Sequence, residues 1–476
     1  MISKDYSEFL ARKAPRPLSC GIEPSQMHDA LFDYQRAVVD FCIRQGRSSL
    51  FLDTGLGKSA CILEWCEQMA LASNGFALIL TPLAVAKQFE REAVKFGYQC
   101  RVVRDASDVR PGINVCNYER LDLLDVAAFG AVALDESSIL KSFAGKTTRS
   151  LIDRFQDTPY RLCATATPAP NDHMELGNHA EFLGIMRAQE MLARWFINDT
   201  STASQHWRLK RSAVHDFWDW VASWARCAET PADLGFDASR FVLPPMEVVR
   251  HATYGDLRAP AGSLFLEDLS STNMHEVKRQ TADARAEAAA SLVSAEPSEP
   301  WLVWVDTDYE ANAVKARMRD AVEVRGSMSP EAKEAAIERF LTSGCTLITK
   351  PAIAGMGLNF QHCARMIYVG RSFSYEQFYQ SVRRCWRFGQ ARSVQVHIIV
   401  AEGEDQIGRV IDRKAEDHRK MKRAMAESMN RASYTGHRHA KIKYNPTHIG
   451  RLPSWLMSSA STTPTVEIGQ RSMAIV

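Results

Sequence analysis

The stretch Asp53-Thr54-Gly55-Leu56-Gly57-Lys58-Ser59 decides the fold, because it joins a β-rich apolar run, SSLFL, to a helix-like run, ACILEWCEQM. Glycines at such a junction let backbone N–H groups converge on phosphate oxygens, and the N-terminus of the following helix favours an anion. Lys58 would neutralise charge on the β- and γ-phosphates, and Ser59 would ligate Mg²⁺. The general pattern has a glycine five residues before Gly57, where this chain has Leu52. The context still predicts a phosphate-binding loop in which Thr54, Gly55, Leu56, Gly57, Lys58 and Ser59 surround a triphosphate.

A second motif in the same half, Val132-Ala133-Leu134-Asp135-Glu136, is an apolar strand that ends in two acids. Asp135 can hold the magnesium that bridges the phosphates, and Glu136 can polarise the attacking water. Together with the loop, this motif predicts ATP and Mg²⁺ as cofactors. Ser59 and Asp135 would be the metal ligands, and Lys58 and Glu136 would be catalytic.

The composition excludes several classes of protein. The chain has 476 residues, 46% of them hydrophobic, and 58 Lys+Arg against 56 Asp+Glu, which is close to the globular average. The longest apolar run, 126–134, is far too short to span a membrane, and the first residues lack the apolar core of a secretory signal. Eleven cysteines without a CxxC pair indicate free thiols in a reducing cytoplasm.

Strand-like and helix-like runs alternate in two series, which is typical of parallel, doubly wound sheets. The expected strands of the first series are 48–52, 77–80, 132–134 and 161–164, and those of the second are 301–305, 346–349, 366–369 and 394–400. The linker would lie at the Ala/Glu-rich stretch 281–295, or slightly earlier near 243–245. We therefore expect an extension (1–30), an ATP-binding domain (31–250), a helical linker (251–298), a second domain (299–412) and a basic tail (413–476).

The order of motifs from about Leu31 to Val400 resembles superfamily 2 helicases and translocases, particularly the Swi/Snf-like branch and its compact phage and prophage relatives. This resemblance implies two tandem RecA-like α/β domains with a cleft between them. In the first half it rests on Phe32-Asp33-Tyr34-Gln35, Thr81-Pro82-Leu83, the acidic box DESSILKS with Lys141, and Thr165-Ala166-Thr167-Pro168 followed by Asn171. It implies that Gln35 reads adenine.

In the second half the resemblance rests on Gly355-Met356-Gly357-Leu358-Asn359 and, most specifically, on QSVRRCWRFGQ at 380–390. It makes Arg387 the arginine finger and Arg384 its companion, while Arg383 is the least favoured of the three. Spacing places Arg384 and Arg387 one helical turn apart, so we expect both to face the same cleft. The residues implied to contact nucleic acid or couple it to hydrolysis are Thr81, Pro82, Thr165, Thr167, Gly355, Gly357, Asn359 and Gln380.

A domain that holds the triphosphate and a second that delivers arginines would hydrolyse ATP only on closure, which converts ATP into movement along a track. We therefore expect an ATP-dependent DNA helicase or translocase in the cytoplasm of a bacterium or a phage host. Its track would be duplex or single-stranded DNA, and no membrane would be involved. Two alternatives stay open: a remodelling translocase that does not separate strands, and a non-catalytic nucleic-acid-binding subunit with a relic ATPase.

Three further features give weaker indications of function. Val214, Phe217, Val221 and Trp224 follow helical spacing in a Trp-rich segment, which favours a buried stripe over base stacking. His173, His179, His437 and His439 form no set with cysteines, so we expect no zinc. The basic stretch 413–443 is equally compatible with a solubilising helix and with nucleic-acid contact.

Overall fold

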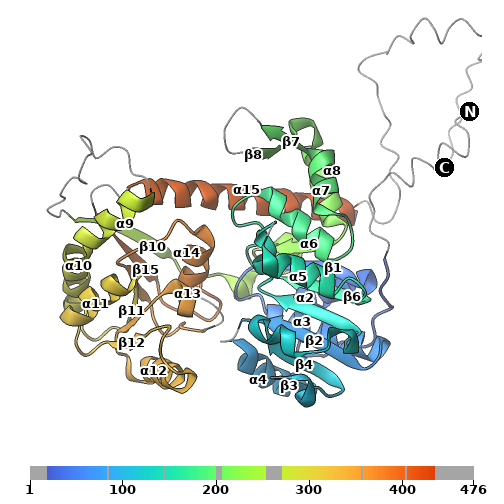
Figure 1. Ribbon diagram of the computed structural model, residues 1–476, viewed down its shortest axis with the longest axis horizontal. Helices are drawn as coiled ribbons and strands as arrows, with labels where there is room; N and C mark the ends of the chain where they lie inside the picture. The colour runs from blue at the N-terminus through green and yellow to red at the C-terminus, as the bar shows by residue number, and fades with distance from the viewer. Residues whose placement is uncertain are drawn as a thin grey trace, which may run out of the picture. The chain divides into compact units, whose positions relative to one another are not determined.

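The computed structural model describes residues 19–82, 85–143, 145–199, 206–253, 271–354, 358–401 and 405–434. The first half forms a seven-stranded parallel sheet in the order β3-β4-β2-β5-β6-β1-β9 (Figure 1). Its strands are β1 (Arg47–Leu52), β2 (Phe76–Thr81), β3 (Cys100–Val102), β4 (Gly112–Asn117), β5 (Ala131–Asp135), β6 (Tyr160–Ala164) and β9 (Ala225–Ala228).

The second half forms a six-stranded parallel sheet in the order β10-β15-β14-β11-β13-β12. Its strands are β10 (Met246–Thr253), β11 (Trp301–Trp304), β12 (Val322–Val324), β13 (Leu347–Thr349), β14 (Arg365–Tyr368) and β15 (Val394–Ala401). A separate antiparallel pair joins β7 (Phe196–Asp199) to β8 (His206–Leu209). The two doubly wound α/β domains predicted from the alternation of runs are thus confirmed. Strand β10, which crosses the expected boundary at residue 250, belongs to the second sheet.

Both faces of the first sheet are covered, because alternate residues of each strand enter two different cores. In β2, Leu78 and Leu80 pack on one face while Ala77 and Ile79 pack on the other. The Ala77 face carries α2 (Asp33–Gln45), α3 (Lys58–Ala72) and α4 (Ala86–Phe96). The Leu78 face carries α5 (Lys146–Arg154), α6 (Leu176–Phe182), α7 (Ala188–Trp195) and α8 (Val214–Ala222). This two-sided burial explains why the strands are nearly continuous apolar runs.

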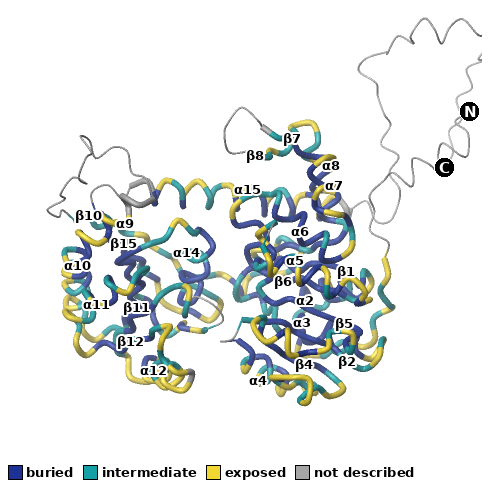
Figure 2. Tube along the Cα trace, viewed as in Figure 1, coloured by how far each residue is buried: buried dark blue, intermediate teal, exposed yellow. Residues whose placement is uncertain are grey.

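The second sheet repeats the arrangement, and its inner strands β11, β13, β14 and β15 are mostly buried, whereas the edge strand β10 is not (Figure 2). Leu302 and Trp304 of β11 pack with α12 (Pro330–Ser343), α13 (Pro351–Ala354) and α14 (Tyr375–Val382). Trp301 and Val303 pack on the opposite face with α10 (Ala282–Ala295) and α11 (Asp308–Arg317), and α9 (Ser271–Gln280) precedes α10.

The expected tail begins as a long helix, α15 (Asp405–Tyr434). Met421, Met425 and Met429 on this helix are buried in the same core as the Trp-rich helix α8. In α8 and just beyond it, Phe217, Val221 and Trp224 are buried, whereas Val214 is half-buried, so the predicted buried stripe is confirmed at three of its four residues. The sequence suggested a solubilising helix or a nucleic-acid contact for this basic segment, and neither of these includes the face that packs into the core of the first domain.

Two sequence-level observations can be compared with the structure directly. All eleven cysteines lie among the described residues, and all are free thiols. Among the helices that the structure describes, none is long and apolar enough to cross a membrane.

Candidate nucleotide site

The loop that follows β1 has the backbone conformation that a phosphate-binding turn requires. Gly55 and Gly57 have φ angles of +95° and +72°, in the left-handed region that glycine enters without strain. A Cβ atom on Gly57 would lie 2.3 Å from Nε2 of Gln35, so a larger residue there would be strained by its φ and would displace the Gln35 side chain. The ammonium of Lys58 donates to the carbonyl oxygen of Leu52 at 3.0 Å and therefore folds back over the loop. Ser59 follows in the first turn of α3, which begins at Lys58.

The side chain of Gln35 is engaged within the first domain. Its Oε1 accepts a hydrogen bond from the N–H of Phe32 at 2.9 Å, and its Nε2 donates to the carbonyl oxygen of Leu56 at 3.1 Å. The hydroxyl of Tyr34 donates to the same carbonyl at 2.9 Å. The Q element therefore holds the phosphate loop, while the reading of adenine by Gln35 stays a prediction.

The two predicted acids lie at the carboxyl end of β5. Asp135 is buried, and its Oδ2 accepts a hydrogen bond from the Thr81 hydroxyl at 2.9 Å. Glu136 has a φ of +54°, the only positive value for a non-glycine residue in the described part of the chain. Such a conformation costs about 1–3 kcal/mol and is concentrated at functional sites. The Glu136 carboxylate accepts from the Thr165 hydroxyl at 3.3 Å and from Nε2 of Gln380, on α14, at 3.5 Å.

The charges of this cluster are mutually dependent. Burial, reinforced by the neighbouring Glu136, raises the pKa of Asp135 to about 7. Burial lowers the pKa of Lys58, although the carboxylates of Glu136, Asp53 and Asp135 oppose that shift. A buried carboxylate that prefers a proton is one whose ionised form needs a cation beside it.

The residues present fit Mg²⁺ and a triphosphate. The Ser59 hydroxyl and the Asp135 carboxylate offer the hard oxygen donors that Mg²⁺ prefers, with waters and phosphates completing its shell. Within the described ranges, no group of three or more His, Cys, Asp or Glu residues is arranged to hold a metal ion on its own.

The arginines of the second domain lie on a turn and not on a helix. Helix α14 ends at Val382, so the helix expected through Arg384 and Arg387 is wrong. The side-chain amide of Gln390 donates to the carbonyls of Gln361, Cys363 and Cys385, and these bonds hold the chain in a turn.

The turn nevertheless brings Arg384 and Arg387 together, because both donate to the carbonyl oxygen of Leu358, at 3.2 and 3.4 Å. Arg384 also donates to the carbonyl of Gln380 at 2.9 Å. Burial lowers the pKa of Arg384 to about 10, although Glu136 opposes the shift, and burial also lowers the pKa of Arg387. Nε of Arg387 is buried without a hydrogen-bond partner.

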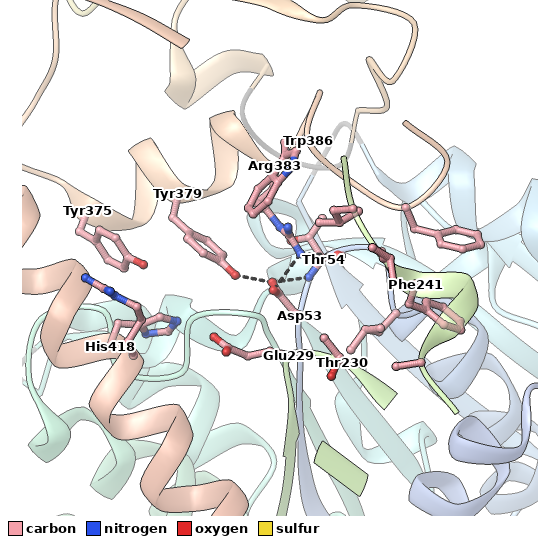
Figure 3. A pocket seen from close by; sticks show the side chains of 17 residues that line it. Asp53, Thr54, Glu229, Thr230, Phe241, Tyr375, Tyr379, Arg383, Trp386 and His418 are labelled. Atoms are coloured by element: carbon pink, nitrogen blue, oxygen red, sulfur yellow. Dashed lines mark hydrogen bonds and ion pairs between the residues drawn. The ribbon is translucent and has the colours of Figure 1, made fainter. Parts of the chain in front are cut away.

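Arg383, the arginine least favoured by the sequence, contacts the phosphate loop. Its Nη2 lies 2.8 Å from Oδ2 of Asp53 and donates to the carbonyl oxygen of Thr54 at 3.0 Å (Figure 3). The Tyr379 hydroxyl donates to the other oxygen of Asp53, and the Lys422 ammonium lies 3.9 Å from it. Burial opposes ionisation of Asp53, but Lys422 and Arg383 outweigh it and lower the pKa of that carboxyl.

Sequence reasoning missed Asp53, Tyr379 and Lys422. Asp53 could have been found, because it begins the loop, but its partners come from α14 and α15, far along the chain.

A pocket of about 530 Å³ opens beside these residues. The loop residues 53–56 line one part of it, and Phe241, Trp386 and Phe388 line another. The rings of Phe241 and Phe388 stack with centroids 4.9 Å apart. His418 of α15 also lines the pocket, and both of its ring nitrogens are buried without a hydrogen-bond partner. The pocket therefore combines aromatic walls with unused polar atoms next to the phosphate loop.

The residues implied to contact nucleic acid are placed in three ways. Thr81, Thr165, Thr167 and Gln380 are buried, and three of them bond to Asp135 or Glu136. Pro82 is half-buried and Asn359 is exposed. Gly355 and Gly357 lie outside the described residues. A role of these residues on nucleic acid stays a prediction.

Two other motif residues also contact distant parts of the chain. Lys141 forms an ion pair with Glu376 at 2.7 Å. Asn171 donates to Glu175 at 2.8 Å and accepts from Lys414 of α15 at 2.9 Å. Both motifs of the first domain therefore contact helices from the C-terminal part of the chain, Lys141 contacting α14 and Asn171 contacting α15.

Comparison with known proteins adds one family match. Among solved structures, the chain is similar to the Sulfolobus solfataricus SWI2/SNF2 ATPase core in complex with dsDNA, with 15% identity, 87% of this chain and 97% of that chain covered, and a TM-score of 0.40. The search of curated proteins gave no match. Residues 284–389 match the helicase conserved C-terminal domain, a range that runs from α10 to the turn carrying Arg384 and Arg387.

Proposed function

We propose that the protein is an ATP-hydrolysing motor of superfamily 2 that moves on DNA. The observation that carries this proposal is the contact of both domains with one carboxylate. Glu136 accepts from Thr165 of the first domain and lies 3.5 Å from Nε2 of Gln380 of the second. The helicase C-terminal family match over residues 284–389 supports the same function independently.

In this mechanism each residue of the first domain has one task. Lys58 would bind the β- and γ-phosphates, and Ser59 and Asp135 would hold Mg²⁺. Glu136 orients the attacking water and takes its proton. Bound Mg²⁺ supplies positive charge to the phosphate oxygens. The raised pKa of Asp135 fits this task, because a carboxylate that resists ionisation alone is stabilised by a cation.

The second domain completes the site. Arg384 and Arg387 donate to the same carbonyl, so a movement of that turn would carry both guanidiniums together. Arginine fingers contribute about 10³–10⁵ in rate. Because Gln380 touches Glu136 from α14, the position of the water-orienting carboxylate depends on how the domains meet. This dependence would couple hydrolysis to domain movement.

Two readings of the motor differ in what happens to the DNA. A helicase separates the strands, whereas a remodelling translocase moves along the duplex and displaces what is bound. A relic ATPase that only binds nucleic acid is disfavoured, because the residues needed for hydrolysis, Lys58, Asp135, Glu136 and Arg387, are all present.

The first experiment measures the ATPase rate with no nucleic acid, single-stranded DNA, duplex DNA and RNA in parallel. We expect DNA to stimulate turnover in the wild type and in Lys95→Ala, an exposed lysine of α4 that serves as the matched control. Lys58→Ala should show no turnover under any condition. A wild type that binds DNA but does not hydrolyse ATP would overturn the motor in favour of the relic.

A second experiment distinguishes the two readings. A helicase displaces one strand of a tailed duplex, whereas a translocase displaces a third strand from a triplex and leaves the duplex intact. In either case the logarithm of the DNA binding constant should fall linearly with the logarithm of the salt concentration, since phosphate contacts dominate binding of this kind.

A further inference from the structure

Helix α15 brings one buried lysine to the phosphate loop. Lys422 is 2% exposed, and its ammonium lies 3.9 Å from Asp53 and 3.5 Å from Glu229. It also donates to the hydroxyl of Tyr379 at 3.3 Å. Lys420, two residues earlier on the same helix, has a side chain that is 65% exposed. Lys422 is therefore buried at the phosphate loop, whereas a neighbouring lysine of the same basic segment faces solvent.

A buried ammonium is costly unless anionic groups surround it. Two carboxylates and a tyrosine hydroxyl surround Lys422, and the ammonium also lies 5.3 Å from the centre of the Tyr379 ring. The neighbouring turns of α15 hold it in place. Met421 and Met425 are buried in the core of the first domain, and the backbone N–H of Cys227 donates to Sδ of Met429.

The partner that matters is Asp53, because it is covalently next to the phosphate loop. Its Oδ1 accepts a hydrogen bond from the N–H of Thr54 at 2.6 Å, which ties the carboxylate to the first turn of the loop. Arg383 donates to both Asp53 and the carbonyl of Thr54. Two cations from separate elements, α15 and the turn after α14, thus hold the same end of the loop.

This inference rests on the proposed ATPase function and deepens it. We propose that Lys422 is a positioning residue of the nucleotide site, which acts through Asp53 to keep residues 53–56 in the conformation that binds phosphate. Helix α15 is then a part of the nucleotide site. Because the contact is made to the loop and not to the reacting atoms, its loss weakens nucleotide binding more than it slows the turnover of bound ATP.

The test compares Lys422→Met with Lys420→Met, the exposed control on the same helix. We measure the affinity for a fluorescent ADP analogue, KM and kcat for ATP without nucleic acid, and the unfolding midpoint. Lys422→Met should weaken nucleotide affinity and raise KM about tenfold or more, the change expected when a charge-assisted contact is lost, with a smaller change in kcat. Lys422→Arg should restore much of the affinity, and Lys420→Met should match the wild type.

A double-mutant cycle identifies the residue through which Lys422 acts. If it acts through Asp53, the variant carrying both Asp53→Asn and Lys422→Met should bind nucleotide about as weakly as Asp53→Asn alone. Independent effects that multiply in the double variant would overturn the proposal. Wild-type affinity in Lys422→Met would also overturn it, while the ATPase function would stand.

Two further outcomes are covered by the same measurements. Should Lys422→Met not fold, Tyr379→Phe tests the network without removing a charge, and it should weaken nucleotide binding in the same sense with an unchanged unfolding midpoint. Wild-type affinity in Tyr379→Phe together with wild-type affinity in Lys422→Gln, which removes the charge, would overturn the proposal. A wild type that neither binds nor hydrolyses ATP removes the proposed function itself and is recognised before any variant is made.

Discussion

Replacement of Arg387 by alanine is the perturbation that most directly tests whether the two domains share an active site. The side chain makes one long hydrogen bond, from Nη1 to the carbonyl of Leu358 at 3.4 Å, and its Nε has no partner. An arginine with five donors and so few bonds is poorly explained by a structural role. Arg387→Ala should therefore leave the fold nearly as stable as before.

The magnitudes separate the two possible roles. One weak hydrogen bond contributes about 0–1 kcal/mol to stability, whereas an arginine finger contributes about 10³–10⁵ in rate, or roughly 4–7 kcal/mol of transition-state stabilisation. Arg384 should behave differently, because it is 4% exposed and donates to the carbonyls of Gln380 and Leu358. Its removal leaves the Gln380 carbonyl without this donor, at about 1–3 kcal/mol if that carbonyl stays buried and unsatisfied, while the Leu358 carbonyl still accepts from Arg387.

The assay measures DNA-stimulated turnover beside denaturant unfolding for Arg387→Ala, Arg384→Ala and a control. Arg392→Ala is the matched control, since Arg392 is an exposed arginine of the same domain in a surface ion pair with Glu299. We expect turnover to collapse in both site variants, stability to fall only in Arg384→Ala, and neither to change in the control. If Arg387→Ala retained most of its stimulated rate, the reasoning that the second domain supplies the transition-state cation would be refuted.

Four other predictions follow from single side chains. Lys58→Ala should abolish turnover with an unchanged unfolding midpoint, because within the described residues the Lys58 ammonium donates one hydrogen bond, to the Leu52 carbonyl. Turnover near the wild-type rate would contradict the loop assignment. Glu136→Gln should bind Mg²⁺ and ATP and retain them through gel filtration, and a loss of affinity as severe as in Lys58→Ala would contradict its role on water alone. Burial and Glu136 raise the pKa of Asp135 from 3.8 to about 7, so the folded protein binds this proton more tightly than the unfolded chain. The nucleotide-free wild type should then lose stability relative to Asp135→Asn as the pH rises from about 4 to 7, by up to about 1.4 kcal/mol per pH unit. If the difference in unfolding free energy between the two proteins were the same at pH 5 and pH 8, the pKa shift would be excluded. Met425→Ala should destabilise the protein by about 2–5 kcal/mol, since Met425 is buried in the core of the first domain, and the exposed Glu427→Ala should not.

The sheets could be predicted because their strands are buried on both faces and are therefore apolar throughout. The eight expected strands all exist, from β1 to β15, with bounds within a residue or two. Five strands of the two sheets were not predicted, namely β3, β4, β9, β10 and β12, and all of them except β4 are edge strands. Ala225–Ala228 is a short edge strand of the first sheet, and Met246–Thr253 is an edge strand of the second sheet whose residues are half-buried or exposed. Edge strands need no continuous apolar run, so composition carries little signal for them.

The acidic half of the site could also be predicted, because the carboxyl ends of parallel strands lie at one edge of a sheet. Strands β5 and β1 flank β6 in that sheet, which brings Asp135 and Lys58 into one cluster. The basic half could not. The prediction assumed that a helix continues through Arg387, and it placed the arginines by helical spacing. Helix α14 ends at Val382, and the Gln390 amide binds the carbonyl of Cys385 in the turn that follows. In this turn Arg383 reaches Asp53.

The C-terminal segment shows why a count of charges did not reveal its role. Summed over 413–443 the lysines and arginines suggest a solvated or nucleic-acid-binding surface, yet Ile407, Ile411, Met421, Met425 and Met429 recur with helical spacing and are all buried. A sum over residues averages this stripe with the exposed face opposite it. Lys422 lies within the stripe, where an unneeded ammonium would be replaced readily by an apolar residue of similar size. The buried Lys422 on this face is therefore the informative feature of the segment, and one acid that it neutralises, Asp53, begins the phosphate loop.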